Sequence, residues 1–496
     1  MEVAVTGALL LLWVLFFFIF SSLKMYKKKS QLPPGPTPWF LLGNLLQKDV
    51  LPVSKNVSKL MDKWGPIFTV WMGPKPMVVL CGYEVVKDAL LDHAEEFGGR
   101  PTLPFFQTVN NGCKGLSCST EKKWRELRRF TLTTLRDFGM GKKTMSKRVQ
   151  EEALCLVEAM ATTKGQLFDV RKYIRIAVSN VLCSVVFGSR FDYKDQVLLE
   201  KLRIMESFVS YLVSYTGQIY NVFPKIMPYL PGQHKKILGD FETLHAYINK
   251  SVESHRETLD YQDPRDYIDC FLMKSEKEQT NHEAIYSQEE LIICVQELFI
   301  AGSLSTSEFL THALLVMARL PHIQEKVQRE IDEVVGANRI PGMEDRVGMP
   351  YTNAVLHEIQ RYDKGSIESF PRETTCPTKF RGYLIPQGTT ICSDMASVHF
   401  DPLQWENPEE FNPGHFLDEK GQFRNRVAFM PFSAGKRACP GEALARMELF
   451  LFFGALLQNF TFQLIGDAKD KDIFTLYEDS GLKPGDLPLK FIRRSI

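Results

Sequence analysis

The stretch Phe432-Ser433-Ala434-Gly435-Lys436-Arg437-Ala438-Cys439-Pro440-Gly441 says most about how this chain folds and what it does. It places a single cysteine on a tight glycine loop, with an aromatic ring at Phe432 and a cation at Arg437. An apolar, helix-forming run follows at once, over residues 443–453. Free backbone N–H groups, a nearby cation and a helix N-terminus all favour a thiolate anion over a thiol. The alternative is an ordinary free cysteine that packs as a small apolar side chain.

A resemblance to the cytochrome P-450 superfamily of heme-thiolate monooxygenases rests first on five positions of this stretch: Phe432, Gly435, Arg437, Cys439 and Gly441. Further segments match in the family's order: Pro33-Pro34-Gly35-Pro36, Trp124 with Arg128, Glu358-Ile359-Gln360-Arg361 and Phe411-Asn412-Pro413-Gly414-His415-Phe416. The sequence is most similar to microsomal family 2, a group of xenobiotic, steroid and fatty-acid hydroxylases. The resemblance implies heme b as cofactor, with the Cys439 thiolate as the ligand of its iron. Such a ligand pushes electron density onto iron, which favours O–O cleavage.

Composition limits the alternatives. The 496 residues carry a net charge of +1, which argues against a nucleic-acid binder because such proteins usually have a basic excess. The ten cysteines are scattered without a CxxC pair, which argues against a disulfide framework or a zinc site and suits a reducing compartment. After the N-terminal region there is no composition shift, repeat or Gly/Ser linker, so we expect one large domain.

The N-terminal region predicts a membrane anchor. Residues 3–20 are almost unbroken apolar sequence, with Thr6 the only polar side chain, and the run extends to Leu23. This length suits one membrane-spanning helix over residues 1–23. A cleaved signal peptide is the alternative, but Glu2 stands where its basic segment belongs and no small-residue cleavage site follows.

The residues after the anchor predict its orientation. Four lysines lie directly behind it, at positions 24, 27, 28 and 29, and positive flanks stay on the cytoplasmic side. Prolines then stiffen the exit, because proline fixes its own φ and cannot continue a helix. We therefore expect a basic, Pro-rich hinge over residues 24–36 and a cytosolic catalytic domain over residues 37–496. The expected location is the endoplasmic reticulum membrane, with a single span.

Helical patterns dominate the rest of the chain. Ser287 and Glu290 form a capping box that opens a proline-free run to Leu320, long enough to cross a whole domain. Pro321 opens another helix that ends at Gly336. A third helix begins at Pro350. Short alternating segments predict strands at 67–71, 76–80 and 380–385. The pattern predicts a fold that is mainly α with small β-sheets (α+β), and the P-450 fold that the resemblance implies is built in this way.

The resemblance implies a set of residues that hold the heme. Trp124, Arg128 and Arg437 would bind its two propionates, with Arg100 or Arg372 as a further donor. A guanidinium suits a carboxylate, although any one of these arginines is nearly as well explained as a solvated surface cation. Gly435 and Gly441 let the backbone approach sulfur and iron more closely than residues with a Cβ can.

Glu358 and Arg361 lie three residues apart on a predicted helix and can pair. An isolated pair of this kind is usually a surface feature of little energetic worth. The resemblance implies instead the family's buried ExxR pair, locked to a partner in the loop before the cysteine. In this sequence His415 stands at that partner position. We expect the pair to serve structure and heme retention, not catalysis.

The oxygen-activating segment departs from the family's pattern. The family's distal helix carries Ala/Gly-Gly-x-Asp/Glu-Thr, and its acid and hydroxyl relay protons during oxygen activation. The matching run here is Ala301-Gly302-Ser303-Leu304-Ser305-Thr306. The catalytic candidates are therefore Ala301 and Gly302, whose small size would leave room beside the iron, and Ser305 and Thr306, which carry hydroxyl groups. Leucine cannot relay a proton. Our hypothesis is that ordered water, Glu308 or Glu368 supplies protons instead, with more leakage to peroxide, although both acids are also explained as solvated carboxylates.

Electrons have to come from a partner. No GxGxxG follows a strand, and no phosphate-binding loop or flavin signature appears. The resemblance names NADPH–cytochrome P-450 reductase as the partner, with cytochrome b5 as a second candidate. Ten basic residues form a candidate docking face, which could also be a merely solvated surface: Lys122, Lys123, Arg125, Arg128, Arg129, Arg136, Lys142, Lys143, Lys147 and Arg148.

Substrate contacts follow from the resemblance alone. Family members shape their pockets at positions that correspond to Phe105, Phe106, Phe208, Tyr211, Phe299, Ala301, Glu368, Phe370 and Leu482. An aromatic residue is more often core than ligand contact, so each of these remains open to that alternative. An apolar pocket suits a small lipophilic substrate. Glu368 suggests a basic amine or a hydroxylated sterol.

The sequence therefore predicts an oxidoreductase: a membrane-bound heme-thiolate monooxygenase that inserts one oxygen atom from O2 into a small lipophilic substrate. The electrons would come from NADPH through the reductase. One alternative is a heme-thiolate isomerase or dehydratase that rearranges peroxides, which Leu304 permits and Ser305 argues against. The other alternative is a non-catalytic heme- or sterol-binding protein.

Overall fold

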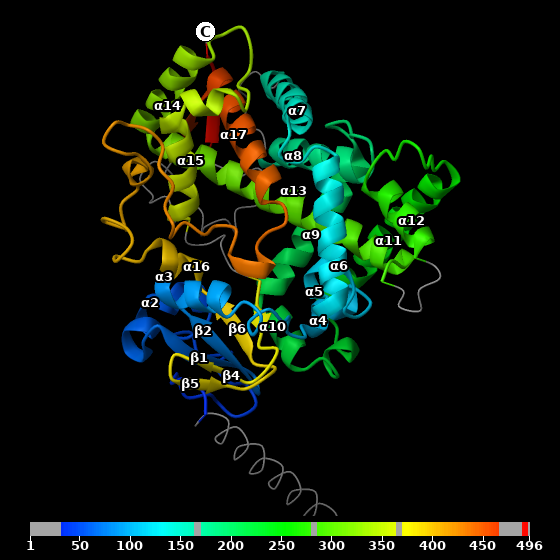
Figure 1. Ribbon diagram of the computed structural model, residues 1–496, viewed down its shortest axis with the longest axis vertical. Helices are drawn as coiled ribbons and strands as arrows, with labels where there is room; N and C mark the ends of the chain where they lie inside the picture. The colour runs from blue at the N-terminus through cyan, green and yellow to red at the C-terminus, as the bar shows by residue number, and fades with distance from the viewer. Residues whose placement is uncertain (1–30, 163–169, 279–284, 364–369, 466–488, 495–496) are drawn as a thin grey trace, which may run out of the picture.

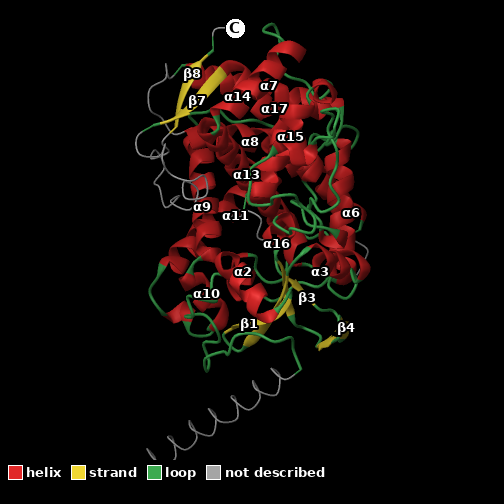
Figure 2. Cartoon of the chain, turned by 90° about the vertical axis from the view of Figure 1, so that its left-hand side faces the viewer, coloured by secondary structure: helices red, strands yellow, loops and turns green. Residues whose placement is uncertain are grey.

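The computed structural model describes residues 31–162, 170–278, 285–363, 370–465 and 489–494. The predicted anchor, residues 1–23, lies outside these ranges. Helices make up the larger part of the molecule, and a small sheet with α2, α3 and α16 forms the end at which the described chain begins (Figures 1 and 2). The expected fold, mainly α with small sheets, is confirmed.

The helices run through the chain in the following order: α2 (Val53–Trp64), α3 (Tyr83–Lys87), α4 (Pro104–Val109), α5 (Gly115–Cys118), α6 (Glu121–Asp137), α7 (Lys143–Ala161), α8 (Val170–Val186), α9 (Gln196–Val213), α10 (Tyr215–Val222), α11 (Gln233–Glu257), α12 (Tyr267–Lys277), α13 (Gln288–Arg319), α14 (Pro321–Val334), α15 (Pro350–Tyr362), α16 (Met395–His399) and α17 (Glu442–Asn459). Short 3-10 or π segments lie between them: η1 (Asp88–Asp92), η2 (Met227–Tyr229), η3 (Asp345–Gly348), η4 (Pro413–Phe416) and η5 (Gly435–Arg437). The predicted helix starts at Ser287, Pro321 and Pro350 are confirmed. The Ser287 side chain caps α13 by accepting the Glu290 N–H, and the two prolines are the first residues of α14 and α15.

The strands form three small sheets: β1 (Ile67–Met72), β2 (Lys75–Leu80), β3 (Arg372–Glu373), β4 (Thr378–Phe380), β5 (Tyr383–Ile385), β6 (Thr390–Ser393), β7 (Phe460–Leu464) and β8 (Leu489–Arg493). The largest sheet has the order β1-β2-β6-β3, with β2 and β6 parallel and the other pairs antiparallel. The remaining strands form the pairs β4–β5 and β7–β8.

One predicted strand is wrong. Residues 380–385 do not form a continuous strand, because the chain reverses at Arg381 and Gly382 and pairs Phe380 with Tyr383. Both turn residues have positive φ, 44° and 90°, as a two-residue hairpin turn requires. The apolar alternation continues across the reversal, which is why it reads as one strand in the sequence.

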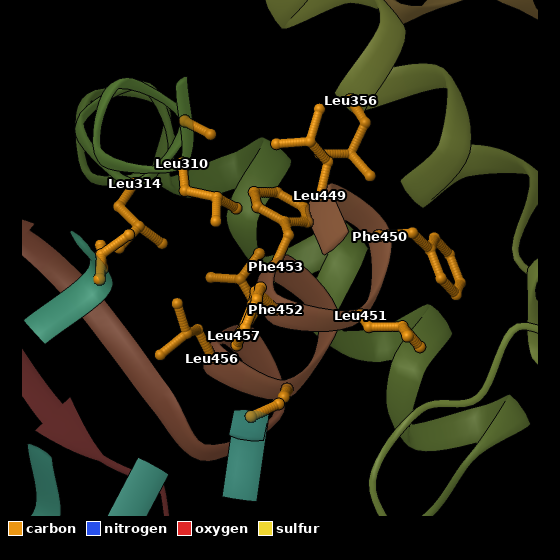
Figure 3. Close-up of a cluster of buried hydrophobic side chains, with 14 of the residues drawn as sticks. Leu310, Leu314, Leu356, Leu449, Phe450, Leu451, Phe452, Phe453, Leu456 and Leu457 are labelled. Carbon is orange, nitrogen blue, oxygen red and sulfur yellow. The ribbon is translucent and has the colours of Figure 1, made fainter. Parts of the chain in front are cut away.

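The core is centred on α13 and α17. Leu310 and Leu314 of α13 pack against Phe453 and Leu456 of α17, and all four side chains are buried (Figure 3). Burying each such side chain contributes about 1.5–3 kcal/mol. Among the helices of the described ranges, α13 alone is long and apolar enough to cross a membrane, but 67% of its apolar window is buried. It is the central helix of the folded domain.

The proline segment before residue 37 is docked rather than free. The carbonyl of Pro33 accepts a hydrogen bond from the Thr69 hydroxyl at 2.8 Å, and that of Pro34 accepts the Thr69 N–H at 2.9 Å. A Cβ at Gly35 would lie 2.0 Å from the Thr69 carbonyl oxygen, so only glycine fits there. Leu32 is also buried in the core. These contacts join residues 33–35 to β1.

Candidate active site

The cysteine loop is closed by its own backbone. The Cys439 N–H donates to the Phe432 carbonyl at 3.0 Å, and the Ala438 N–H donates to the Gly435 carbonyl at 3.1 Å. Gly435 has a φ of +71°, and a Cβ there would lie 1.9 Å from the Leu90 carbonyl oxygen. Glycine is therefore required at 435 by both conformation and space.

The sulfur of Cys439 sits directly before the N-terminus of α17. The side chain lies deep among protein atoms yet is accessible from one side. Burial raises the pKa of the thiol, while the backbone N–H groups of Gly441 and Glu442 and the charge of Arg128 act in the opposite direction. The predicted helix N-terminus and N–H donors are therefore in place. Burial is the largest of these effects, so the pKa of the thiol is raised overall.

One expectation about this loop changes. The cation that acts on the sulfur is Arg128, because Arg437 points away from it to the carbonyls of Gly98 and Ser119. A Cβ at Gly441 would lie 3.9 Å from the Cys439 sulfur, which is an ordinary contact.

The predicted propionate residues gather beside the cysteine loop. Arg437 lies over the Trp124 ring, 3.9 Å from its centroid, and Arg128 donates to the Ala438 carbonyl at 2.7 Å. Arg372 donates to the Ala434 carbonyl at 2.7 Å. Arg100 donates to the carbonyls of Phe370 and Pro371 at 2.9 and 2.7 Å. Four arginines from distant parts of the chain thus converge on one place.

This cluster is chemically incomplete. Within the described part of the chain, Arg100 Nε, Arg372 Nη1 and Arg437 Nη1 are buried and have no hydrogen-bond partner. Burial first, and then neighbouring arginines, lower the pKa to about 9 for both Arg372 and Arg437, and burial lowers that of Arg100 to about 10. Buried like charges with free N–H groups call for an anion. Two carboxylates bound here would satisfy both requirements.

The comparisons with known proteins agree with this geometry. The family model described as Cytochrome P450 matches residues 33–491. This chain belongs to the cytochrome P450 family. It is 46% identical to rat (Rattus norvegicus) cytochrome P450 2C55 over 466 residues, which cover 94% of this chain and 95% of the relative. It is 46% identical to human (Homo sapiens) cytochrome P450 2C8 over 461 residues, 93% of this chain and 94% of the relative. Cytochrome P450 2C20 of Macaca fascicularis is 47% identical over 461 residues, with 93% and 94% coverage.

Membership makes this protein a heme-thiolate monooxygenase, an oxidoreductase with heme b as cofactor. The residues present fit that group: one accessible cysteine before a helix N-terminus, and buried arginines with unpaired N–H groups for its carboxylates. When bound, heme supplies the iron at which O2 is activated.

The P450 ExxR pair is fully buried, and its expected geometry is confirmed. Arg361 Nε and Nη2 donate to the two Glu358 carboxylate oxygens at 2.8 and 2.7 Å. The other N–H groups of Arg361 donate to the carbonyls of His399, Pro408 and Glu410, at 2.9, 2.8 and 3.0 Å. His415 Nδ1 lies 3.1 Å from the Glu358 carboxylate. The pair therefore locks α15 to the loop that precedes the cysteine.

The distal segment on α13 splits into two faces. Ala301 and Ser305 are exposed in the middle of an otherwise buried helix, so other protein atoms do not cover this face of α13. The Ser305 hydroxyl donates to the Ala301 carbonyl at 2.6 Å. Leu304 is buried and packs with an apolar cluster. A Cβ at Gly302 would lie 2.9 Å from a Leu182 methyl group, so this glycine allows close packing with α8.

Thr306 and Glu308 both have side-chain partners inside the fold. Thr306 is buried, and its hydroxyl is hydrogen-bonded to the carboxyl of Glu448 on α17. Burial raises the pKa of Glu448 well above its usual range. Glu308 forms an ion pair with Arg175, so it is not the solvated carboxylate of the alternative interpretation. Glu368 lies outside the described residues.

Most of the predicted pocket aromatics gather in one cluster. The ring centroids of Phe105 and Tyr211 lie 4.6 Å apart, and those of Phe106 lie 5.8 Å from Phe208 and 5.6 Å from Phe370. The cluster joins α4, α9 and the segment directly before β3. Phe299 contacts Phe187 instead, at 6.1 Å. Leu482 lies outside the described residues.

The sequence interpretation missed a clamp on the segment that precedes α6, which includes the short helix α5. Glu297 of α13 accepts the N–H groups of Leu116 and Ser117, at 2.6 and 3.0 Å, and the Asn110 amide at 3.1 Å. The same segment presents the Ser119 carbonyl to Arg437 at 2.8 Å. Burial raises the pKa of Glu297 to about 7. An acid inside an apolar helical pattern was the only sequence signal, and it did not indicate a partner.

The arginine cradle predicts a test of heme retention. Replacing Arg437 or Arg372 with methionine removes a buried donor but keeps an apolar stem. We expect heme to dissociate roughly tenfold faster, because each guanidinium contributes a charge-assisted hydrogen bond to the propionates. Transfer of heme to apomyoglobin, followed by absorbance, measures the rate. Arg381→Met is the control, since Arg381 is exposed and pairs with Asp88. Equal rates in all variants would rule out the assignment.

Proposed function

We propose that this protein is a microsomal P450 that hydroxylates small lipophilic molecules with electrons from NADPH, delivered by a separate reductase. Cys439 is the iron ligand in this proposal, and Arg100, Arg128, Arg372, Arg437 and Trp124 hold the propionates. Ala301, Gly302 and Ser305 form the oxygen side. The observation that carries the proposal is the convergence of the accessible sulfur with three buried, incompletely paired guanidiniums.

The reductase would dock on exposed basic residues of α6, α7 and the turn between them. Arg125, Arg136, Lys142, Lys143 and Lys147 are all exposed. This turn lies beside the start of α17, since a Cβ at Gly141 would lie 4.0 Å from that of Ala443. Two of the ten basic residues named for the candidate docking face make contacts within the fold instead. Lys123 pairs with Glu290, and Arg128 contacts the cysteine loop.

Charge reversal tests this docking face. We expect Arg136→Glu with Lys142→Glu to lower the rate of reductase-supported NADPH oxidation by roughly tenfold at low ionic strength, because complementary charges speed association. At higher salt concentration, the NADPH oxidation rates of the variant and the unchanged protein should become more similar. Lys235→Glu with Lys236→Glu, exposed on α11, is the matched control. Salt-independent rates, or an equal loss in the control, would count against this face.

The overall activity is tested by incubating the holoenzyme with NADPH, the reductase and a panel of lipophilic compounds under labelled O2. Mass analysis should detect one labelled oxygen atom in a product. Turnover of a lipid hydroperoxide without NADPH would support the isomerase alternative instead. Heme spectral shifts on ligand binding without any product would support a non-catalytic binding protein.

Membrane attachment in the endoplasmic reticulum, by the single predicted span, is part of the proposal. The described domain adds support, because large apolar side chains are exposed on two neighbouring segments. Trp39, Leu41 and Leu46 lie near the start of the chain, and Val213, Tyr215, Ile226, Tyr229 and Leu230 lie around α10. Both segments meet at Gly73, where an added Cβ would contact Val222 and the Leu41 carbonyl. Apolar patches of this kind suit contact with a membrane.

Proton supply at Leu304 carries a separate prediction. With Glu308 held by Arg175, ordered water is the proton source that we favour. Leu304→Glu should raise the amount of product per NADPH by about threefold, because a positioned acid assists proton transfer. Leu304→Gln is the control, since it has similar size and polarity but no acid. Peroxide release and product are measured together, and an unchanged ratio in the glutamate variant would reject the hypothesis.

A further inference from the structure

Arg175 joins three helices through two carboxylates. It lies on α8, and its Nη1 donates to Glu206 Oε2 of α9 at 2.7 Å. Its Nη2 donates to Glu308 Oε1 of α13.

The charges of this group are only partly screened by water. The Arg175 side chain is 11% exposed, while those of Glu206 and Glu308 are 35% and 30% exposed. Burial opposes the charged form of Arg175, and the two acids more than offset this effect, so the pKa of Arg175 is raised. Since a nearly buried guanidinium that loses an acid partner is left poorly satisfied, each ion pair helps to hold its helix in place.

The helices that this group joins carry both sides of the proposed pocket. Glu206 stands two residues before Phe208 on α9, and Tyr211 follows one turn later. Both rings pack against Phe105, with centroids 6.1 and 4.6 Å away. Glu308 stands three residues after Ser305 on α13. A shift of α9 away from α8 and α13 would therefore separate the aromatic wall from the oxygen side of the site.

We propose that Arg175, Glu206 and Glu308 form a clamp that holds α9 over the heme pocket and controls the entry of bulky lipophilic ligands. The three are positioning residues, because none of them touches the reacting atoms. The clamp rests on the proposed placement of the pocket between α4, α9 and α13. It does not depend on the reductase or on turnover, so it can be tested by ligand binding alone.

Two azoles that bind heme iron through nitrogen serve as probes. Imidazole is small enough to enter without displacement of α9, whereas clotrimazole is bulky. Stopped-flow absorbance of the Soret band gives the association rate of each with the holoenzyme. We expect Arg175→Met and Glu206→Gln each to raise the clotrimazole rate roughly fivefold, through loss of a charge-assisted hydrogen bond. The imidazole rate should stay within about twofold of the unchanged protein.

The three contacts make distinct predictions. Glu308→Gln leaves α9 tied to α8 through Arg175, so its effect should be smaller than that of Glu206→Gln. The double variant Arg175→Met with Glu206→Gln should have the same clotrimazole rate as Arg175→Met alone, because both substitutions remove the same ion pair between α8 and α9. If Arg175→Met folds poorly, Arg175→Lys serves as the second variant. Its clotrimazole association rate should lie between that of the unchanged protein and that of Glu206→Gln. Added salt should raise the rate of the unchanged protein toward that of the variants.

A matched ion pair elsewhere separates the clamp from general loosening. Arg339 and Asp345 form a two-point pair, at 2.5 and 2.7 Å, that touches neither α9 nor α13. Arg339→Met should leave both azole rates unchanged. The clamp is overturned if clotrimazole binds at the same rate in every clamp variant, or if imidazole accelerates as much as clotrimazole. Equal acceleration by Arg339→Met would also overturn it.

Discussion

Cys439→Ser is expected to abolish monooxygenation and the red-displaced Soret absorption of the reduced, carbon monoxide-bound enzyme. The hydroxyl of serine cannot replace a thiolate as the donor of electron density to iron. We expect the loss of activity to exceed the roughly 10- to 100-fold that removal of an outer hydrogen-bond partner of a metal ligand typically causes. The loop itself should survive, because its closure depends on backbone hydrogen bonds and on Gly435.

The control for this substitution is a cysteine outside the site. Cys376 is exposed, and its side chain contacts Thr378 rather than the cysteine loop. Cys376→Ser should keep the carbon monoxide spectrum, the heme content and the activity. A Cys439→Ser enzyme that still gave the thiolate spectrum with full heme content would refute the central assignment.

Glu358→Gln is expected to be the most damaging substitution for stability. Both side chains of the pair are fully buried, and Glu358 accepts hydrogen bonds from Arg361, the Asn412 N–H and the His415 ring. Removing its charge leaves the Arg361 guanidinium buried without compensation, which costs about 3–5 kcal/mol. The loop before the cysteine loses its anchor to α15 at the same time. We therefore expect the variant to be produced mainly without heme.

Heme content per polypeptide and the midpoint of denaturant unfolding measure this effect. Arg361→Met should behave in the same way, since it leaves the Glu358 carboxylate buried. Glu126 and Arg129 form a control pair with the same i,i+3 spacing, but Arg129 is 73% exposed. Glu126→Gln should change stability by less than about 1 kcal/mol. A Glu358→Gln protein with normal heme content and stability would show that the pair is dispensable.

Local sequence signals determined much of the fold. Ser287, Pro321 and Pro350 predicted the starts of three helices, because capping and proline chemistry act within one turn. The same locality explains the failure at residues 380–385. Alternation of apolar and polar residues cannot reveal a chain reversal when the same alternation continues through the two turn residues.

The sequence by itself determined the thiolate loop, its following helix and the family, since these depend on residue types at short, fixed spacing. Only the tertiary structure decided which charges meet. It brings Arg100, Arg128, Arg372 and Arg437 together from distant segments. It also pairs Thr306 with Glu448, and Glu308 with Arg175. The physical reason is that burial and long-range packing select the partner of a charged group, and neither quantity can be read from its neighbours in the chain.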